Sequence, residues 1–261
     1  MAFPLSLVDF TTNFTDFKGS ENAINTMKLS ILDWAAVAMI GHTEPVSKVM
    51  LKMIENECGT PESFIFGSKA KFPARSAALI NGVASHALDY DDTNFLYLGH
   101  PSVVVNSAVL AVANMVNLSL KETIECSLIG CEVATRVGIW LGKDHYNKGF
   151  HITSTAGVFG AAMGSSRALD LSNEATKNAL NLAASKASGL KVQFGTMGKP
   201  YHAGMASSSG VEVAILAFHG FEAAKDTFYG KSGFGMAYGR QENNSDLLFL
   251  KTDFLFSKIK H

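Results

Sequence analysis

Residues 74–88 read ARSAALINGVASHAL and carry small or apolar side chains on nearly every side of a helical wheel. A helix that is apolar all round has no face to offer to water, so it belongs inside a larger domain. A second such stretch, VVVNSAVLAVANMV at residues 103–116, follows Pro101, and proline is favourable in the first turn of a helix. We therefore expect an all-α fold built around these two helices, and, because they are apolar on too many sides for the surface of a monomer, a homodimer built largely from this helical face.

Further helical segments flank these two. Apolar residues recur at helical spacing, and Ser119 with Glu122 forms a capping-box pattern ahead of one of the segments. Helices are predicted over residues 21–39, 45–57, 122–141, 155–168, from 172 into the 180s, and over 210–220. Residues 60–73 are predicted to be a loop with one short extended piece. The glycines within 155–168 follow no β-branched strand, which favours close helix packing over a phosphate-binding loop.

Composition excludes several classes of protein. The chain has 261 residues, and only 17% are charged, against about a quarter in an average soluble chain. Lys and Arg together number 22 against 23 for Asp and Glu, a net charge of −1. This balance argues against a polybasic nucleic-acid binder, and the high apolar content of 47% argues against a disordered chain.

The cysteines and the first residues bear on the compartment. Three cysteines are an odd number without metal-type spacing, so a reducing, cytoplasmic environment is expected. Residues 1–10 lack the basic start of a signal peptide. The longest smooth apolar run, residues 34–41, is shorter than the roughly 20 residues that span a bilayer. We expect no membrane partner.

A polar cluster follows the first buried helix. Residues 86–93 read HALDYDDT, and residues 99–102 read GHPS. Three carboxylates within four residues repel one another and are costly to bury, which favours a chemical role over packing. Asp89, Thr93 and His100 are therefore candidates for an acid–base and hydrogen-bonding group.

Two other interpretations of this cluster stay open. Asp91 and Asp92 could lie in a solvated loop, and we expect them to be less central than Asp89, hydrogen-bonding the loop that carries His100. His86 and His100 with the carboxylates could also ligate a cation, although nothing in the spacing establishes the geometry of a metal site.

Two more motifs carry polar side chains among small residues. GFHIT at residues 149–153 places His151 where its imidazole could line a cavity. GTMGKPYHAG at residues 195–204 is predicted to be a rigid loop whose Lys199 and His202 suit the recognition of a carboxylate. A structural histidine and a charged loop tip are the alternatives.

In this order, the strings HALDYDDT, GHPS, GFHIT, ASKASGL (184–190), GTMGKPYHAG and GKSGF (230–234) resemble the MmgE/PrpD family. That family includes 2-methylcitrate dehydratase, cis-aconitate decarboxylase and iminodisuccinate epimerases. The resemblance implies an enzyme without cofactor or metal that acts on small di- and tricarboxylates, usually as a homodimer. It also implies a large helical domain, a smaller α+β lid, and an active site in the cleft between them.

The resemblance also assigns candidate residues. By position in the motifs, the candidate catalytic residues are Asp89, Thr93, His100 and Lys199, and the candidate substrate-binding residues are His151, His202 and Lys260, with Lys258 as an alternative to Lys260. We expect Asp89 and His100 to act as an acid–base pair that Thr93 orients. Lys199, His151 and Lys260 are expected to supply positive charge.

The domain assignment follows from the same comparison. Residues 1–250 are expected to form the helical domain, and residues 251–261 the start of a lid that is absent from this chain. The loop 94–99 is more aromatic than the family pattern, and Ile152 replaces its usual proline. Without a lid that excludes water, we expect weak binding and slow turnover.

The leading functional hypothesis is a lyase that dehydrates a 2-methylcitrate-like hydroxy acid by acid–base catalysis. A cis-aconitate-type decarboxylase and an iminodisuccinate epimerase are alternatives within the family. A non-catalytic helical module that dimerises or binds an anion is the alternative from another class.

Overall fold

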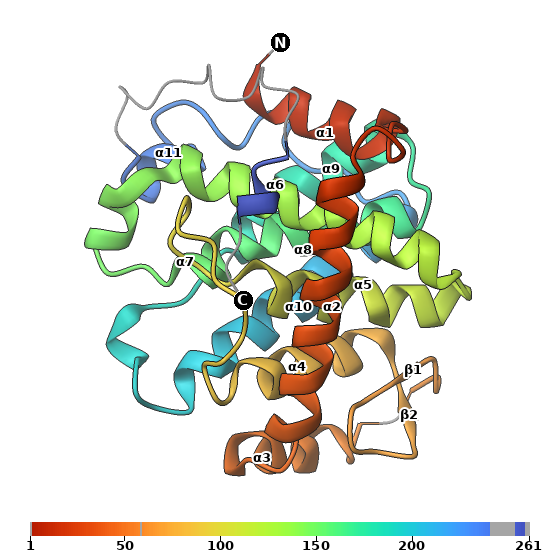
Figure 1. The fold of residues 1–261 in the computed structure, drawn as a ribbon. Helices are drawn as coiled ribbons and strands as arrows, with labels where there is room; N and C mark the ends of the chain where they lie inside the picture. The colour runs from red at the N-terminus through yellow and green to blue at the C-terminus, as the bar shows by residue number, and fades with distance from the viewer. Residues whose placement is uncertain (1, 58, 241–253, 259–261) are drawn as a thin grey trace.

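The structure, a computed structural model, describes residues 2–57, 59–240 and 254–258, and these residues are largely α-helical (Figure 1). The α-helices are α1 (Phe3–Asn13), α2 (Glu21–Gly41), α3 (Pro45–Ile54), α4 (Ala74–His86), α5 (Pro101–Val116), α6 (Leu120–Asn147), α7 (Ile152–Thr155), α8 (Gly157–Ala168), α9 (Asn173–Ala183), α10 (Gly198–Phe218) and α11 (Phe234–Ala237). A two-residue antiparallel pair, β1 (Ser63–Phe64) with β2 (Lys71–Phe72), lies in the predicted loop region. The expected all-α class is confirmed.

Helices α4 and α5 form the centre of the domain. Helix α4 packs against α10, α5 and α2, while α8 packs against α6, α10 and α5. Every residue of α4 from Ser76 to His86 is buried, as are 12 of the 16 residues of α5. The prediction of two buried helices is therefore confirmed, and the single chain covers both of them.

Glycines allow these helices to approach closely. A Cβ atom at Gly82 of α4 would lie 2.8 Å from the Cα of Gly204 in α10. At Gly160 of α8 a Cβ atom would lie 2.5 Å from the carbonyl oxygen of Gly130 in α6. The glycine at 160 thus serves helix packing, as the sequence indicated.

The sequence prediction was wrong about the start of α10. This helix begins at Gly198 rather than near residue 210, so Lys199 and His202 lie on its first turns and not in a loop. Pro200 is tolerated there because backbone N–H groups in the first turn of a helix have no partner within the helix. Helix α1 was not predicted at all, and α6 continues beyond residue 141 through a non-helical Gly142 to Asn147.

Helix α2 crosses the front of the molecule in the view of Figure 1. It is the one helix among the described residues with the length and apolar composition of a membrane span. Its polar contacts tie it to the domain: Trp34 donates a hydrogen bond from Nε1 to Ser107 of α5, and Ser30 bonds to Asp92 and Ser102. These contacts make α2 a helix of the helical domain.

The last described residues pack on the same domain. Phe254, Leu255 and Phe256 are buried, and the following 3-10 turn, η4 (Phe256–Lys258), contacts α2 and α6. The predicted domain boundary at residue 250 lies outside the described residues.

Candidate functional site

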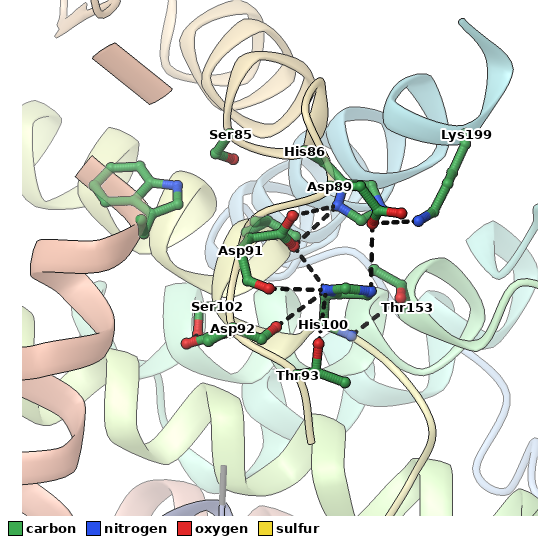
Figure 2. A network of polar contacts seen from close by, with 12 residues as sticks. Ser85, His86, Asp89, Asp91, Asp92, Thr93, His100, Ser102, Thr153 and Lys199 are labelled. Carbon is green, nitrogen blue, oxygen red and sulfur yellow. Dashed lines mark hydrogen bonds and ion pairs between the residues drawn. The ribbon is translucent and has the colours of Figure 1, made fainter. Parts of the chain in front are cut away.

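Four segments of the chain bring the polar motifs together. They are the end of α4 with the loop after it, the start of α5, the start of α7 and the first turns of α10 (Figure 2). Six of the seven predicted site residues lie here: Asp89, Thr93, His100, His151, Lys199 and His202. Lys260 lies outside the described residues, and the alternative Lys258 lines a different cavity of about 740 Å³ beside Arg136.

Asp89 lies at a sharp turn after α4. Its φ angle of 57° is in the left-handed region, which few residues other than glycine adopt, Asp and Asn most readily. This turn directs the half-exposed carboxylate to the Lys199 ammonium, with which it forms an ion pair, and to His100, whose Nε2 is 3.6 Å away. Asp89 thus connects the α4 loop with α10 and with the start of α5.

His100 is held by acceptors on one side of its ring. Its Nδ1 lies 2.9 Å from the Asp91 carboxylate and 3.0 Å from the carbonyl oxygen of Asp92, so Nδ1 carries a proton. The Thr93 hydroxyl is 3.5 Å from the same nitrogen, and the backbone N–H donates to the Thr153 hydroxyl. Nε2 is left facing Asp89 and is free for proton transfer.

The pKa of His100 is raised above its ordinary value. Burial alone would lower this pKa, but the hydrogen bond to Asp91 and the negative charge of Asp91 outweigh burial, and Asp89 adds a smaller contribution. Lys199 opposes the rise. His100 therefore holds a proton on both ring nitrogens to a higher pH than a solvent-exposed histidine does.

Asp91 lies at the centre of this group. Its buried carboxylate accepts hydrogen bonds from Nδ1 of His86 and from Nδ1 of His100, each at 2.9 Å (Figure 2). Burial would raise the pKa of Asp91, but the charge of His86 and the hydrogen bonds from both imidazoles hold it well below its usual range. Asp91 hydrogen-bonds His100, as expected. The expectation that Asp91 is less central than Asp89 was wrong.

Asp92 has the opposite electrostatic environment. Its carboxyl group is buried and receives hydrogen bonds from the Ser30 and Ser102 hydroxyls. Burial raises the pKa of Asp92 to about 7 against these hydrogen bonds, and the carboxylates of Asp91 and Asp33 add to the rise. Asp92 therefore keeps its proton up to about pH 7, whereas Asp91 is already ionised well below that pH.

Two histidines form the opposite wall of the site. Lys199 and His202 are three residues apart on α10 and share one face, and Nδ1 of His202 lies 3.2 Å from Nδ1 of His151. His151 also stacks on His86. Burial, together with the smaller effect of the charges of His86 and His202, lowers the pKa of His151 to about 2. His151 is therefore neutral, and the expectation that it supplies positive charge was wrong.

The ionic side of the site borders a cavity. This cavity has a volume of about 380 Å³, which is within the usual range for small-molecule sites. Its lining includes Glu44, His86, Asp89, Thr196 and Lys199.

Four residues of the site could also hold a cation. Ligand atoms of His86, Asp89, Asp91 and His100 lie within 4.8 Å of one another. However, protons on the two imidazoles already satisfy the Asp91 carboxylate. A histidine that binds a metal usually donates its second N–H group to a partner. Nε2 of His86 is buried without a hydrogen-bond partner among the described residues. Shared protons therefore account for this arrangement better than a metal does.

His86 was not among the predicted site residues, although the sequence carried a signal for it. It is the last residue of a helix whose other side chains are apolar or small except Arg75 and Asn81, and a polar side chain at the end of such an apolar helix needs a buried partner. That partner is Asp91, five residues later.

Comparison with known proteins gives a consistent result. The sequence model of the MmgE/PrpD N-terminal domain matches residues 6–246. Cis-aconitate decarboxylase of Homo sapiens is 30% identical over 229 residues, which cover 84% of this chain and 47% of that protein. The Mus musculus enzyme of the same name is also 30% identical, over 84% of this chain and 46% of its own length. The cis-aconitate decarboxylase-like protein oryM of Aspergillus oryzae is 27% identical, over 82% and 47%. The chain spans about half the length of these relatives.

Proposed function

The chain belongs to the MmgE/PrpD family, and from this membership we propose that it is a lyase acting on small di- and tricarboxylates, with decarboxylation of a cis-aconitate-like acid as its reaction. The observation that carries this proposal is the Asp89 carboxylate, which faces both the Lys199 ammonium and Nε2 of His100, with Asp89 and Lys199 lining the cavity. The names of the relatives favour decarboxylation over the dehydration that the sequence analysis placed first.

Substrate binding follows from the ion pair between Asp89 and Lys199. In the free protein the Asp89 carboxylate occupies the position between Lys199 and His100 that a substrate carboxylate would take. An entering polycarboxylate competes for the same two cations, and Asp89, half exposed, has room to move aside. A site shielded from water strengthens these ionic contacts.

The chemical step needs one proton donor. When the C–C bond to the departing carboxylate breaks, CO₂ leaves and the electron pair spreads over the adjacent double bond towards a second carboxylate. His100 donates the Nε2 proton to the carbon that gains this electron density, while Nδ1 stays bonded to Asp91. Asp91 stabilises the charged imidazole before the transfer, and Asp89 and Thr93 orient it. No metal or cofactor takes part in this scheme.

The test offers cis-aconitate, 2-methylcitrate and iminodisuccinate separately to the purified protein and follows each by proton NMR. We expect cis-aconitate to lose CO₂ and yield a product with a new alkene signal, and Lys199→Ala or His100→Ala to abolish the reaction. Lys191→Ala is the control, because Lys191 lies over the Tyr146 ring and not at the cavity.

The other outcomes separate the alternatives. Conversion of 2-methylcitrate alone would identify a dehydratase, and loss of the optical activity of iminodisuccinate, followed by polarimetry, would identify an epimerase. Neither binding nor turnover of any of the three acids by a folded protein would contradict the proposal and favour a non-catalytic module.

A further inference from the structure

A buried carboxylate lies outside the site, on helix α6. Glu132 has none of its side chain exposed, and its Oε1 accepts hydrogen bonds from the Arg136 guanidinium at 2.7 Å. The Glu132 carboxylate also accepts two backbone hydrogen bonds, from Leu255 at 3.2 Å to Oε1 and from Phe256 at 2.8 Å to Oε2. Burying a carboxylate is costly unless charge and hydrogen bonds compensate, and here two of the donors come from residues 123 and 124 positions later. Glu132 therefore fastens the segment 254–258 to α6.

The fastened segment reaches the loop before His100. Phe254, Leu255 and Phe256 are all buried, which leaves the backbone of this segment little freedom. The Leu255 carbonyl oxygen accepts a hydrogen bond of 3.4 Å from Nδ2 of Asn94. Asn94 is itself fully buried, so this amide has no solvent to replace its partner.

Asn94 closes the loop 94–99, which lies between the site residues Thr93 and His100. Its backbone exchanges two hydrogen bonds with Gly99, and its Oδ1 accepts the N–H of Leu96. Thr93 precedes this closed loop and His100 follows it. On the far side, the buried Tyr97 ring packs on Gly138 of α6, where a Cβ atom would lie 2.3 Å from the ring. Helix α6 thus supports the loop directly through Gly138 and indirectly through Glu132 and the segment 254–258.

We propose that Glu132 and Asn94 are positioning residues. Glu132 anchors the segment 254–258, and Leu255 of this segment holds Asn94. Asn94 in turn holds the loop that aligns Thr93 and His100 beside Asp91. The inference rests on the proposed function only in taking His100 as the acid–base group. It adds residues that contact neither the cavity of about 380 Å³ nor the ion pair of Asp89 and Lys199.

Three variants separate positioning from stability. Glu132→Gln replaces an acceptor of two backbone N–H groups by an amide that can accept at one oxygen only, so the segment loosens. Asn94→Ser keeps a short side chain that can accept the Leu96 N–H but cannot reach Leu255. Val133→Ala, at the fully buried neighbour of Glu132, lowers stability without touching the anchor and is the control.

The readouts require no substrate. Histidine NMR measures the pKa of His100, and hydrogen exchange measures protection of the Leu255 and Phe256 amides. The groups that face His100, namely Asp91, Asp89, Lys199 and His86, are present in all three variants. We expect Glu132→Gln and Asn94→Ser to lower the pKa of His100 by about one unit, because the contact with Asp91 loosens. Glu132→Gln should also increase exchange at Leu255 and Phe256.

Two results would overturn the inference. One is an unchanged His100 titration in Asn94→Ser. The other is a shift in the destabilised Val133→Ala that equals the shift in Glu132→Gln, since the effect would then reflect stability alone. A wild-type protein whose His100 titrates as described but which converts no polycarboxylate contradicts the proposed function and leaves this inference standing.

Discussion

The contact between Asp91 and His100 allows a quantitative prediction for Asp91→Asn. An opposite charge at hydrogen-bonding distance raises the pKa of a histidine by about 1–3 units, and here Nδ1 of His100 and the carboxylate are 2.9 Å apart. We expect the variant to lower the pKa of His100 by about 2 units, equivalent to roughly 2.7 kcal/mol. At a pH above that pKa, the charged fraction of His100 falls about tenfold for each unit, and the rate of proton transfer falls with it.

Stability should change with pH in a defined direction. The folded state lowers the pKa of Asp91, so its contribution to stability is present above the unfolded value of about 4 and is lost as the pH falls. The folded state raises the pKa of His100, so the contribution of His100 to stability is present below about pH 6.5. This contribution is lost as the pH rises through the pKa of His100 in the folded state. Asp91→Asn should therefore lower the free energy of unfolding most between about pH 4 and 6.5, on the order of 3 kcal/mol, and less at pH 9.

Histidine NMR titration and urea unfolding at pH 6 and pH 9 measure these two effects. Asp89→Asn is the matched control, because Asp89 has the same side chain but is 52% exposed and 3.6 Å from His100. Solvent screens its charge, so it should shift the pKa of His100 by only a few tenths of a unit. The reasoning fails if the two variants shift His100 equally, or if Asp91→Asn leaves it unchanged.

Three further predictions concern stability and association. In Asp92→Asn, the unfolding free energy should decline less between pH 5 and pH 8 than in the wild type, because a carboxyl group whose pKa is raised to about 7 loses its stabilising proton over this range. Urea unfolding at the two pH values measures the difference, about 2.5 kcal/mol. Gly204→Ala should lower stability by about 1–3 kcal/mol in thermal unfolding, since its Cβ atom would lie 2.4 Å from the Leu79 carbonyl oxygen and would push α10 away from α4. The chain should sediment as a dimer at micromolar concentration, and a stable monomer would contradict this. The expectation that α4 and α5 provide the dimer contact was wrong, because the chain itself buries them. The contact is now expected at the exposed apolar side chains of α2 and α3, such as Leu32 and Val49.

The two helices that carry apolar or small side chains on nearly every side were predicted correctly. The stretches 74–88 and 103–116 are apolar all round, and burial is the one environment that suits such a helix. The start of α10 was misread because Gly198 and Pro200 are typical of turns, although glycine and proline are also compatible with the first turn of a helix. The short N-terminal helix α1 has Pro4 in its first turn and depends on packing against α9 and α8, which the local sequence does not reveal.

Membership of the site was easier to predict than the charge of each member. Local sequence identifies ionisable groups, but their pKa values depend on burial and on partners far away in the chain. The pKa of Asp92 is raised because the group is buried beside the carboxylates of Asp91 and Asp33, and the hydrogen bonds from Ser30, 62 residues earlier, and from Ser102 only partly offset this. His151 is neutral because His86 and His202 surround it in a buried position. Neither environment could be inferred from spacing.

The different roles of Asp89 and Asp91 follow from the backbone at the end of α4. Asp89 adopts a left-handed conformation, so the chain turns there, and two residues later the side chain points into the protein instead of out of it. Asp89 consequently meets Lys199 at the cavity, where a substrate carboxylate could replace it, while Asp91 meets His86 and His100 in the interior, where nothing can. In the proposed reaction, one carboxylate is therefore exchangeable and the other is permanent. His100 would release a proton and then recover it, which requires a permanent counter-charge on Nδ1 and an exchangeable one at Nε2, and this turn supplies both from residues two positions apart.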